Sequence, residues 1–213
     1  MLRTNFLGIV PVACSLVSLA VVTTPAIAQT TYPFTTSYET NTSDIPTDIP
    51  GILKLIFQAT STDAPYGLTN ANSLAYAKID LNTGAGIFGT DPAALGAPNL
   101  PKGFFTLQGS GNNKFFGEVS GTSLLDPTTL INTLSGNVTI TGGEGIFQGA
   151  IGNLTLSATE TFSPDFSSSK GQFSVNGSIV TSAPTTVSEP TFGFSLLAFG
   201  ALGAGYFLKR KLN

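Results

Sequence analysis

The feature that most constrains the fold is a strict alternation of apolar and polar side chains in residues 154–162 and 172–180. In the first segment, LTLSATETF, four apolar side chains and Glu160 fall on one face, and hydroxyl side chains fall on the other. The second segment, QFSVNGSIV, repeats the pattern. A period of two residues is that of a β-strand with one buried face. The linking SPDFSSSK therefore predicts a hairpin.

Other segments carry weaker versions of this pattern. They predict strands at residues 52–59, 73–81, 104–109, 114–121 and 136–141, with shorter ones at 85–89 and 145–150. About eight or nine strands at this spacing predict an all-β fold, an antiparallel eight- or nine-stranded barrel or a sandwich, over residues 51–183. Residues 29–50 are rich in Thr, Ser and Pro and are expected to form an extended arm before it.

Two Asp-Pro pairs predict short helical turns between the strands. Asp91-Pro92 and Asp126-Pro127 each place a capping side chain before a proline at the first helical position. The second pair begins DPTTLINTL, which is expected to form about two helical turns.

The composition excludes several kinds of chemistry. Between residues 29 and 187 there is no histidine, cysteine, arginine or tryptophan. Histidine-based catalysis, thiol nucleophiles, disulfides and the usual zinc ligands are therefore absent from this region. The same region holds eleven acids and five lysines and has no basic stripe, so nucleic-acid binding is not expected. We expect no catalytic activity, cofactor or metal.

Glu160 stands out because it lies on the apolar face of its predicted strand. A buried carboxyl needs a partner or a raised pKa. One interpretation is that Glu160 reaches water at the mouth of the barrel. The other is that it contacts a ligand in a barrel cavity.

Other acids suggest sites only weakly. Glu118 with Asp126, or Glu144 with Glu160, could act as paired carboxylates in a glycosidase, but nothing in the sequence brings either pair together. The segment SDIPTDIP at 43–50 lacks the closely spaced acids of a calcium loop, and it is interpreted as a flexible acidic arm.

A glycine-rich segment at 84–89 fits the pattern GxGxxG of dinucleotide-binding proteins. That site needs a helix directly afterwards, and the following TDPAALGAPNLP cannot form one. Glycines that let a strand bend are the favoured interpretation.

A second glycine-rich stretch, TITGGEGIFQGAIGNLTLSAT, resembles the G-G-x-G-x-F-x-G-A-x-G signature of small eight-stranded barrels similar to allene oxide cyclase and dirigent proteins. The matching residues are Gly142, Gly143, Gly145, Phe147, Gly149, Ala150 and Gly152. The resemblance covers about 20 residues and implies a calycin-like barrel. None of the catalytic positions of those families is matched.

Residues 1–28 have the three parts of a secretory signal peptide. Arg3 gives a charged start, residues 6–22 are apolar, and Ala26 and Ala28 frame a small-x-small cleavage pattern. The expected partners are the Sec translocon and signal peptidase, which would leave Gln29 as the new N-terminus.

The C-terminal segment has a motif, an apolar span and a basic stop. A linker at 184–190 ends in Ser188, Glu189 and Pro190, and the next 18 residues are uncharged. As a helix these span about 27 Å, close to the thickness of a hydrocarbon core. The predicted transmembrane helix and basic tail occupy residues 191–213, and the basic stop comprises Lys209, Arg210 and Lys211. By the positive-inside rule the tail is cytoplasmic.

These three parts together resemble the PEP-CTERM sorting signal of exosortase substrates, with Ser188 where the family normally has proline. The resemblance implies an exported protein that is first anchored in the inner membrane of a Gram-negative-type bacterium. An exosortase-type enzyme would then release it to the cell surface or extracellular matrix. A plain membrane anchor is the alternative.

The expected function is therefore structural or adhesive and non-enzymatic, with extracellular polysaccharide as a candidate partner. Two alternatives remain at this point. A barrel could bind a small apolar ligand, as the phenylalanine-rich segment at 104–116 suggests, or the acids could form a carboxylate-based enzyme.

Overall fold

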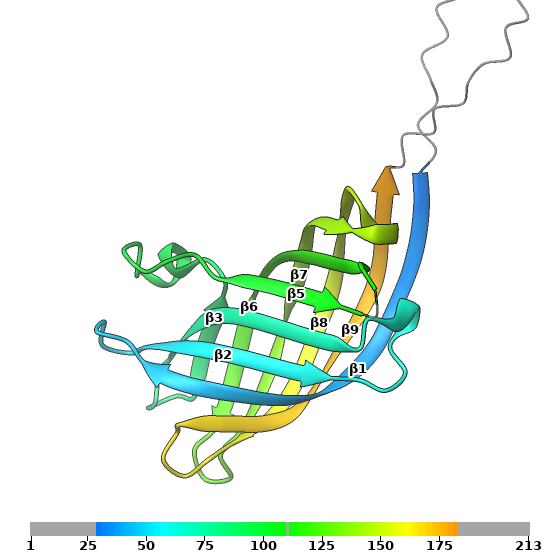
Figure 1. Ribbon diagram of the computed structural model, residues 1–213. Coiled ribbons are helices and arrows are strands. Elements are labelled where there is room, and N and C mark those ends of the chain that lie inside the picture. The colour runs from blue at the N-terminus through cyan, green and yellow to red at the C-terminus, as the bar shows by residue number, and fades with distance from the viewer. Residues whose placement is uncertain (1–28, 110, 183–213) are drawn as a thin grey trace, which may run out of the picture. The chain divides into compact units, whose positions relative to one another are not determined.

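The computed structural model describes residues 29–109 and 111–182, which form a single antiparallel sheet of nine strands. Figure 1 shows the sheet curling round on itself. The strands are β1 (Gln29–Pro46), β2 (Ile52–Thr60), β3 (Asn70–Ile79), β4 (Ala85–Gly89), β5 (Phe104–Gln108), β6 (Lys114–Asp126), β7 (Ile131–Glu144), β8 (Ala150–Phe162) and β9 (Ser168–Ser182). Three short 3₁₀ helices are η1 (Pro65–Gly67), η2 (Pro92–Leu95) and η3 (Gly145–Phe147).

The nine strands form a near-ring of eight strand positions. The hydrogen-bonded order is β2-β1-β9-β8-β7-β6-β4-β3-β5, and further pairings join β2 to β3 and β5 to β6. β4 and β5 share one position, because each pairs with both β3 and β6. The ring is uneven, with strands of 5 to 18 residues, and it is one continuous sheet rather than the two sheets of a sandwich.

The predicted hairpin is confirmed. β8 and β9 pair antiparallel from Ala150↔Thr181 to Phe162↔Ser169, with side chains alternating between buried and exposed along β8. The predicted strands from residue 52 onward are also present, except for the one at 145–150.

The sequence predicted that residues 29–50 form an extended arm before the sheet, and this part of the prediction is wrong. Residues 29–46 form the longest strand, β1, which pairs with β9 over residues 29–43 and with β2 over residues 39–46. Its inward row contains aromatic side chains but more hydroxyl and acidic ones, so its apolar content is low although the row is buried. Apolar alternation, the usual sign of a strand with one buried face, is therefore weak in β1.

Two other local expectations were wrong. The segment at 145–150 forms η3 rather than a strand, because Gly145 and Gly149 have φ values of +66° and +69°, outside the extended region. In DPTTLINTL the chain makes a single turn, capped by Asp126, and β7 begins at Ile131. The first Asp-Pro pair does form the expected turn, η2, with the Asp91 side chain accepting from the Ala93 N–H.

The two ends of the near-ring differ in character. At the end where Gln29 pairs with Ser182, here called the terminal end, aromatic rings fill the interior. Phe147 on η3 lies with its ring centroid 5.3 Å from that of Tyr32 and 5.9 Å from that of Phe115. The opposite end, here called the loop end, carries the β1–β2, β3–β4, β6–β7 and β8–β9 connections.

The middle of the interior is centred on Phe173 of β9. Its ring stacks on Tyr38 at a centroid distance of 4.7 Å and meets the edge of Phe57 at 5.1 Å. The Tyr38 hydroxyl donates to the carbonyl oxygen of Leu68 at 2.6 Å, so this buried polar group is satisfied.

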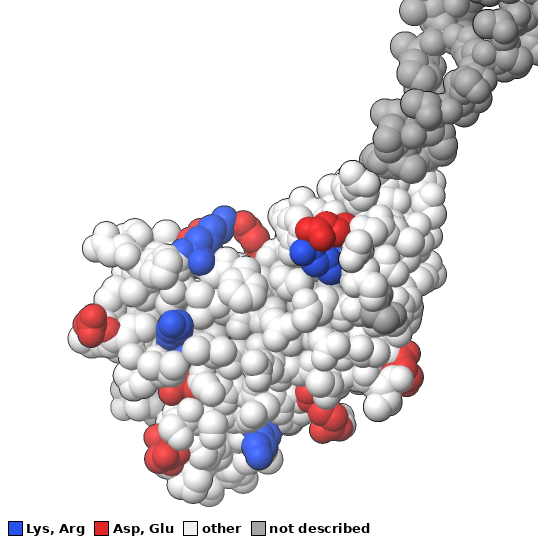
Figure 2. Space-filling view, in the orientation of Figure 1, with Lys and Arg blue, Asp and Glu red and all other residues white. Residues whose placement is uncertain are grey.

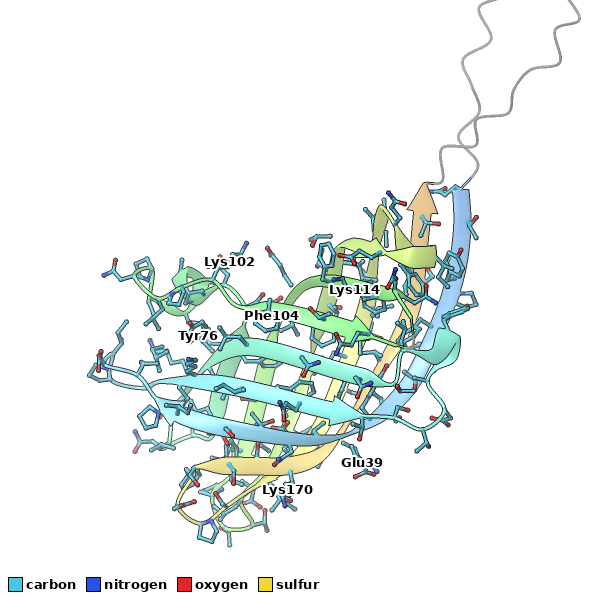
Figure 3. All side chains as sticks on the ribbon, in the orientation of Figure 1. Glu39, Tyr76, Lys102, Phe104, Lys114 and Lys170 are labelled. Carbon is cyan, nitrogen blue, oxygen red and sulfur yellow. The ribbon has the colours of Figure 1, made fainter. Side chains whose placement is uncertain are left out.

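A smaller apolar cluster lies on the outer face of the sheet. The excursion between β4 and β5 folds back over Tyr76, which packs with Ile52, Leu95 and Ala97. The Tyr76 hydroxyl donates to the carbonyl oxygen of Pro101 at 2.8 Å, and Figure 3 labels Tyr76 beneath this excursion.

Candidate functional site

The interior of the near-ring contains two neighbouring cavities toward the loop end. The larger has a volume of about 70 Å³, and its walls are mostly apolar, with the rings of Phe57, Phe105 and Phe173 among them. The smaller has a volume of about 20 Å³. Both are lined by Glu160, so this side chain stands where the two spaces meet.

Four polar side chains line the smaller cavity, and one of them is Ser123 of β6. The other three carry carboxyl or amide groups and are here called the polar cluster: Asp44 of β1, Asn132 of β7 and Glu160 of β8. Each lies within two residues of a strand end, and all three point inward because of the two-residue period of their strands. Their exposed fractions are 3%, 3% and 8%, so the cluster is buried.

Hydrogen bonding satisfies this cluster only in part. Glu160 accepts from the hydroxyls of Ser169 at 3.3 Å and Thr42 at 3.5 Å, both of which are long contacts. Asp44 Oδ2 and Asn132 Oδ1 have no hydrogen-bond partner among the described residues. Buried polar atoms are nearly always paired, so the two unpaired acceptors make this cluster a candidate site for a hydrogen-bond donor.

The carboxyl groups of the cluster are harder to ionise than usual. Burial, and then the neighbouring Glu160, raise the pKa of Asp44 from 3.8 to about 7, with the Ser169 hydroxyl opposing the shift. Burial also raises the pKa of Glu160, against the effect of its two hydroxyl donors. No other titratable group lines either cavity among the described residues.

Of the two buried carboxyls, Asp44 and Glu160, the sequence singled out only Glu160. Glu160 lies on the buried face of its strand, as the alternation predicted, and it faces the cavities rather than open water. Asp44 was assigned to a flexible acidic arm, and that interpretation is wrong because Asp44 is buried in β1. The signal for Asp44 is its place in the inward row of β1, four and six residues after Thr40 and Tyr38 respectively along the same alternation.

The structure does not bring together the acid pairs considered from the sequence. Glu118 is exposed and forms an ion pair with Lys102, and Glu144 is exposed and forms one with Lys114 at 2.8 Å. Asp126 caps the turn that precedes β7. Glu144 therefore lies on the outer face, away from the buried Glu160.

The Asp44–Glu160 pair also does not match a glycosidase site. The two carboxyls of such an enzyme flank a sugar linkage. The cavity that both of these acids line has a volume of about 20 Å³, which is room for about one water molecule.

The GxGxxG segment lies in and just before β4 and serves chain packing. Gly84 has a φ of +73°, and a Cβ atom there would lie 2.0 Å from the carbonyl oxygen of Leu125. A side chain at this position would collide with the backbone of β6, so glycine is required by the close approach of the two chain segments.

A second hollow lies on the outer face of the sheet, over β1, β2, β3 and β5. This outer groove has a volume of about 600 Å³. It is lined by Glu39, Thr40, Asn41, Gln58, Ala59, Thr60, Asn70, Ala71, Asn72, Gln108 and Lys170. Figure 3 labels Glu39 and Lys170 at its β1–β9 side.

Strand register arranges the groove side chains in rows. Asn41, Gln58 and Asn72 are opposite one another across β1, β2 and β3. The adjacent row of Ile56, Leu74 and Phe104 is apolar, and Phe104 is 51% exposed. Figure 2 shows that charged side chains are sparse over this face.

Several sequence predictions fall outside the described residues. These are the signal peptide with Ala26 and Ala28, the motif Ser188 to Pro190, the apolar span, and the basic stop Lys209 to Lys211. Within residues 29–109 and 111–182, no helix is long and apolar enough to cross a membrane. In the same ranges no group of three or more acids is placed to hold a metal ion.

Comparison with protein-family models, with curated proteins and with solved structures gives no match.

Proposed function

We propose that this chain is an exported, non-enzymatic surface protein that holds extracellular polysaccharide in its outer groove. The export part rests on the sequence, namely the predicted signal peptide and the PEP-CTERM-like segment from Ser188 to Lys211. The pairing of Gln29 with Ser182 supports it, because the chain enters and leaves the folded body at one end. The near-ring of strands and the glycine signature at 142–152 support a calycin-like barrel.

The export proposal predicts a defined mature chain. We expect mass spectrometry of the protein recovered outside the producing cell to find Gln29 at its N-terminus and to lack Lys209, Arg210 and Lys211. Deleting the exosortase-type enzyme should leave the basic stop on a membrane-bound precursor. A mature protein that keeps the basic stop in the presence of that enzyme would instead indicate a plain anchor.

The outer groove is the observation that carries the binding role. Amide side chains present both donors and acceptors, as sugar hydroxyl groups do. Five amides line the groove, whereas only two charged side chains do, and these have opposite signs: Glu39 and Lys170. The exposed ring of Phe104 lies in the row alongside, where it offers an apolar surface to the C–H face of a sugar. This chemistry favours a neutral glycan over a charged polymer.

We expect the double variant Gln58→Ala with Asn72→Ala to bind polysaccharide about tenfold more weakly or worse. Each of the two substitutions removes hydrogen bonds to the sugar that are worth about 1 kcal/mol. Affinity electrophoresis of the full chain through gels that contain neutral or acidic polysaccharides measures this.

The matched control replaces Asn137 and Asn153, which are exposed on β7 and β8 away from the groove, and it should bind like the unchanged chain. Binding to a neutral glycan should also be insensitive to salt. An equal loss of polysaccharide binding in the two double variants would contradict the role of the groove. Binding only to acidic polymers, and only at low salt, would contradict it as well.

A further inference from the structure

The two unpaired atoms of the polar cluster show which kind of group can bind there. When Asp44 is ionised, Asp44 Oδ2 and Asn132 Oδ1 are both acceptors, and Glu160 has only two long hydrogen bonds from hydroxyl groups. The group that matches them is a hydrogen-bond donor. Leaving a buried acceptor unpaired costs about 1 to 3 kcal/mol, so a donor that binds here recovers free energy.

The walls around the cluster show what else the partner must carry. Seven of the eleven residues that line the smaller cavity are hydrocarbon side chains, as are most of those that line the larger one. A hard cation such as Ca²⁺ takes six to eight oxygen ligands, which these walls do not supply. A water molecule fits the smaller cavity but gains nothing from the larger apolar one. A donor group attached to a short hydrocarbon suits both cavities, because the donor can occupy the smaller one and the hydrocarbon the larger one.

The volumes limit the length of that hydrocarbon. A cavity of about 150 Å³ lined by apolar side chains accommodates benzene, which has six heavy atoms. On that scale the two spaces, about 70 Å³ and about 20 Å³, hold about four heavy atoms together. This corresponds to one donor atom and about three carbons.

The charge of the cluster selects among donors. Its acceptors include two carboxyls, and no basic side chain lines either cavity among the described residues. The described ion-paired lysines, Lys102 and Lys114, lie on the surface with Glu118 and Glu144. An ammonium group has three N–H donors and a positive charge, so it can pair with both carboxyls and the amide oxygen.

We propose that the interior of the near-ring is a binding site for a primary amine on a short hydrocarbon chain. The ammonium group lies against Asp44, Asn132 and Glu160, and the carbons extend past Glu160 into the apolar cavity lined by Phe57, Phe105 and Phe173. This site is separate from the outer groove and does not depend on polysaccharide binding.

Side-chain NMR of the full chain in detergent, with ¹³C-labelled Asp and Glu carboxyls, tests the site directly. The probe is n-propylammonium, compared with n-propanol, which has the same heavy-atom count without charge, and with tetramethylammonium, which is charged but has no donor. We expect saturable shifts of the Asp44 and Glu160 signals with n-propylammonium. Binding of n-propanol should be about tenfold weaker or more, and tetramethylammonium should give no shift.

A second test measures how variants and pH change the binding of n-propylammonium. Asp44→Asn should weaken n-propylammonium binding about tenfold or more, whereas Glu118→Gln, an exposed substitution on β6, should leave it unchanged. Affinity should fall as the pH is lowered below about 7, because Asp44 then takes up a proton and loses its charge.

Three outcomes would overturn the proposal. Equal shifts with n-propylammonium and n-propanol would rule out recognition of the ammonium group. Shifts that persist unchanged in Asp44→Asn would place the probe elsewhere. The probes are also tested on the unchanged chain, so this result does not depend on whether a variant folds. If none of the three probes shifts the carboxyl signals, the cavity holds an ordered water only.

Discussion

Replacing Phe173 with alanine is expected to lower the free energy of unfolding by about 3 to 5 kcal/mol, the range for removal of a buried ring. Phe173 is 2% exposed and joins rings from three other strands, since it stacks on Tyr38 and meets the edges of Phe57 and Phe105. The space left behind would add to the neighbouring apolar cavity, and the strands cannot close it without breaking their hydrogen-bonded register.

Urea denaturation of the full chain, followed by tyrosine fluorescence or circular dichroism, measures this loss. The matched control is Phe116→Ala, because Phe116 is a strand residue whose side chain is 38% exposed on the outer face. The control should cost about 1 kcal/mol or less. Equal losses for the two variants would show that Phe173 is not the centre of the core.

The second large effect is a fall in stability as the pH rises from 5 to 8. The folded-state pKa of Asp44 is about 7, whereas its ordinary value is 3.8. Between these values the folded chain holds a proton that the unfolded chain releases, so protonation favours folding at low pH and this contribution disappears above about pH 7. One such group changes stability by about 1.4 kcal/mol per pH unit, or about 2 to 3 kcal/mol over this range.

Asp44→Asn should reduce this dependence, because the amide resembles the protonated carboxyl at every pH. The raised pKa of Glu160 contributes a dependence of the same sign, which should remain. Glu39→Gln, an exposed substitution on the same strand as Asp44, should leave the pH dependence unchanged. Measuring from pH 5 upward avoids the opposite effect of Asp165, whose pKa is lowered to about 2 by hydroxyl and backbone donors. Stability that is flat or rises from pH 5 to 8 in the unchanged chain would contradict a buried, protonated Asp44.

The strands that the sequence predicted are those whose inward row is apolar. β8 shows this most clearly, because Leu154, Leu156 and Phe162 are buried and the hydroxyls between them are exposed. β1 was missed because Thr36, Thr40, Thr42 and Asp44 occupy half or more of its inward row. Those side chains are buried because β1 pairs with both β9 and β2, and these pairings join segments far apart in the chain.

The candidate site was recognisable only in part for the same reason. The alternation alone places Glu160 on a buried face. Its partners Asp44 and Asn132 are 116 and 28 residues earlier in the chain, and they meet Glu160 only once the sheet has closed. Likewise the rows of the outer groove depend on register, which sets Gln58 opposite both Asn41 and Asn72.

By itself the sequence determined the all-β class, the β8–β9 hairpin and the inward direction of Glu160, because a two-residue period is a local property of the chain. Only the tertiary structure decided that the strands form a near-ring with β4 and β5 in one position, that β1 belongs to it, and that two carboxyls share a buried space. These depend on which strands pair and in what register. That choice is made by the fit of the interior as a whole, which no single segment encodes.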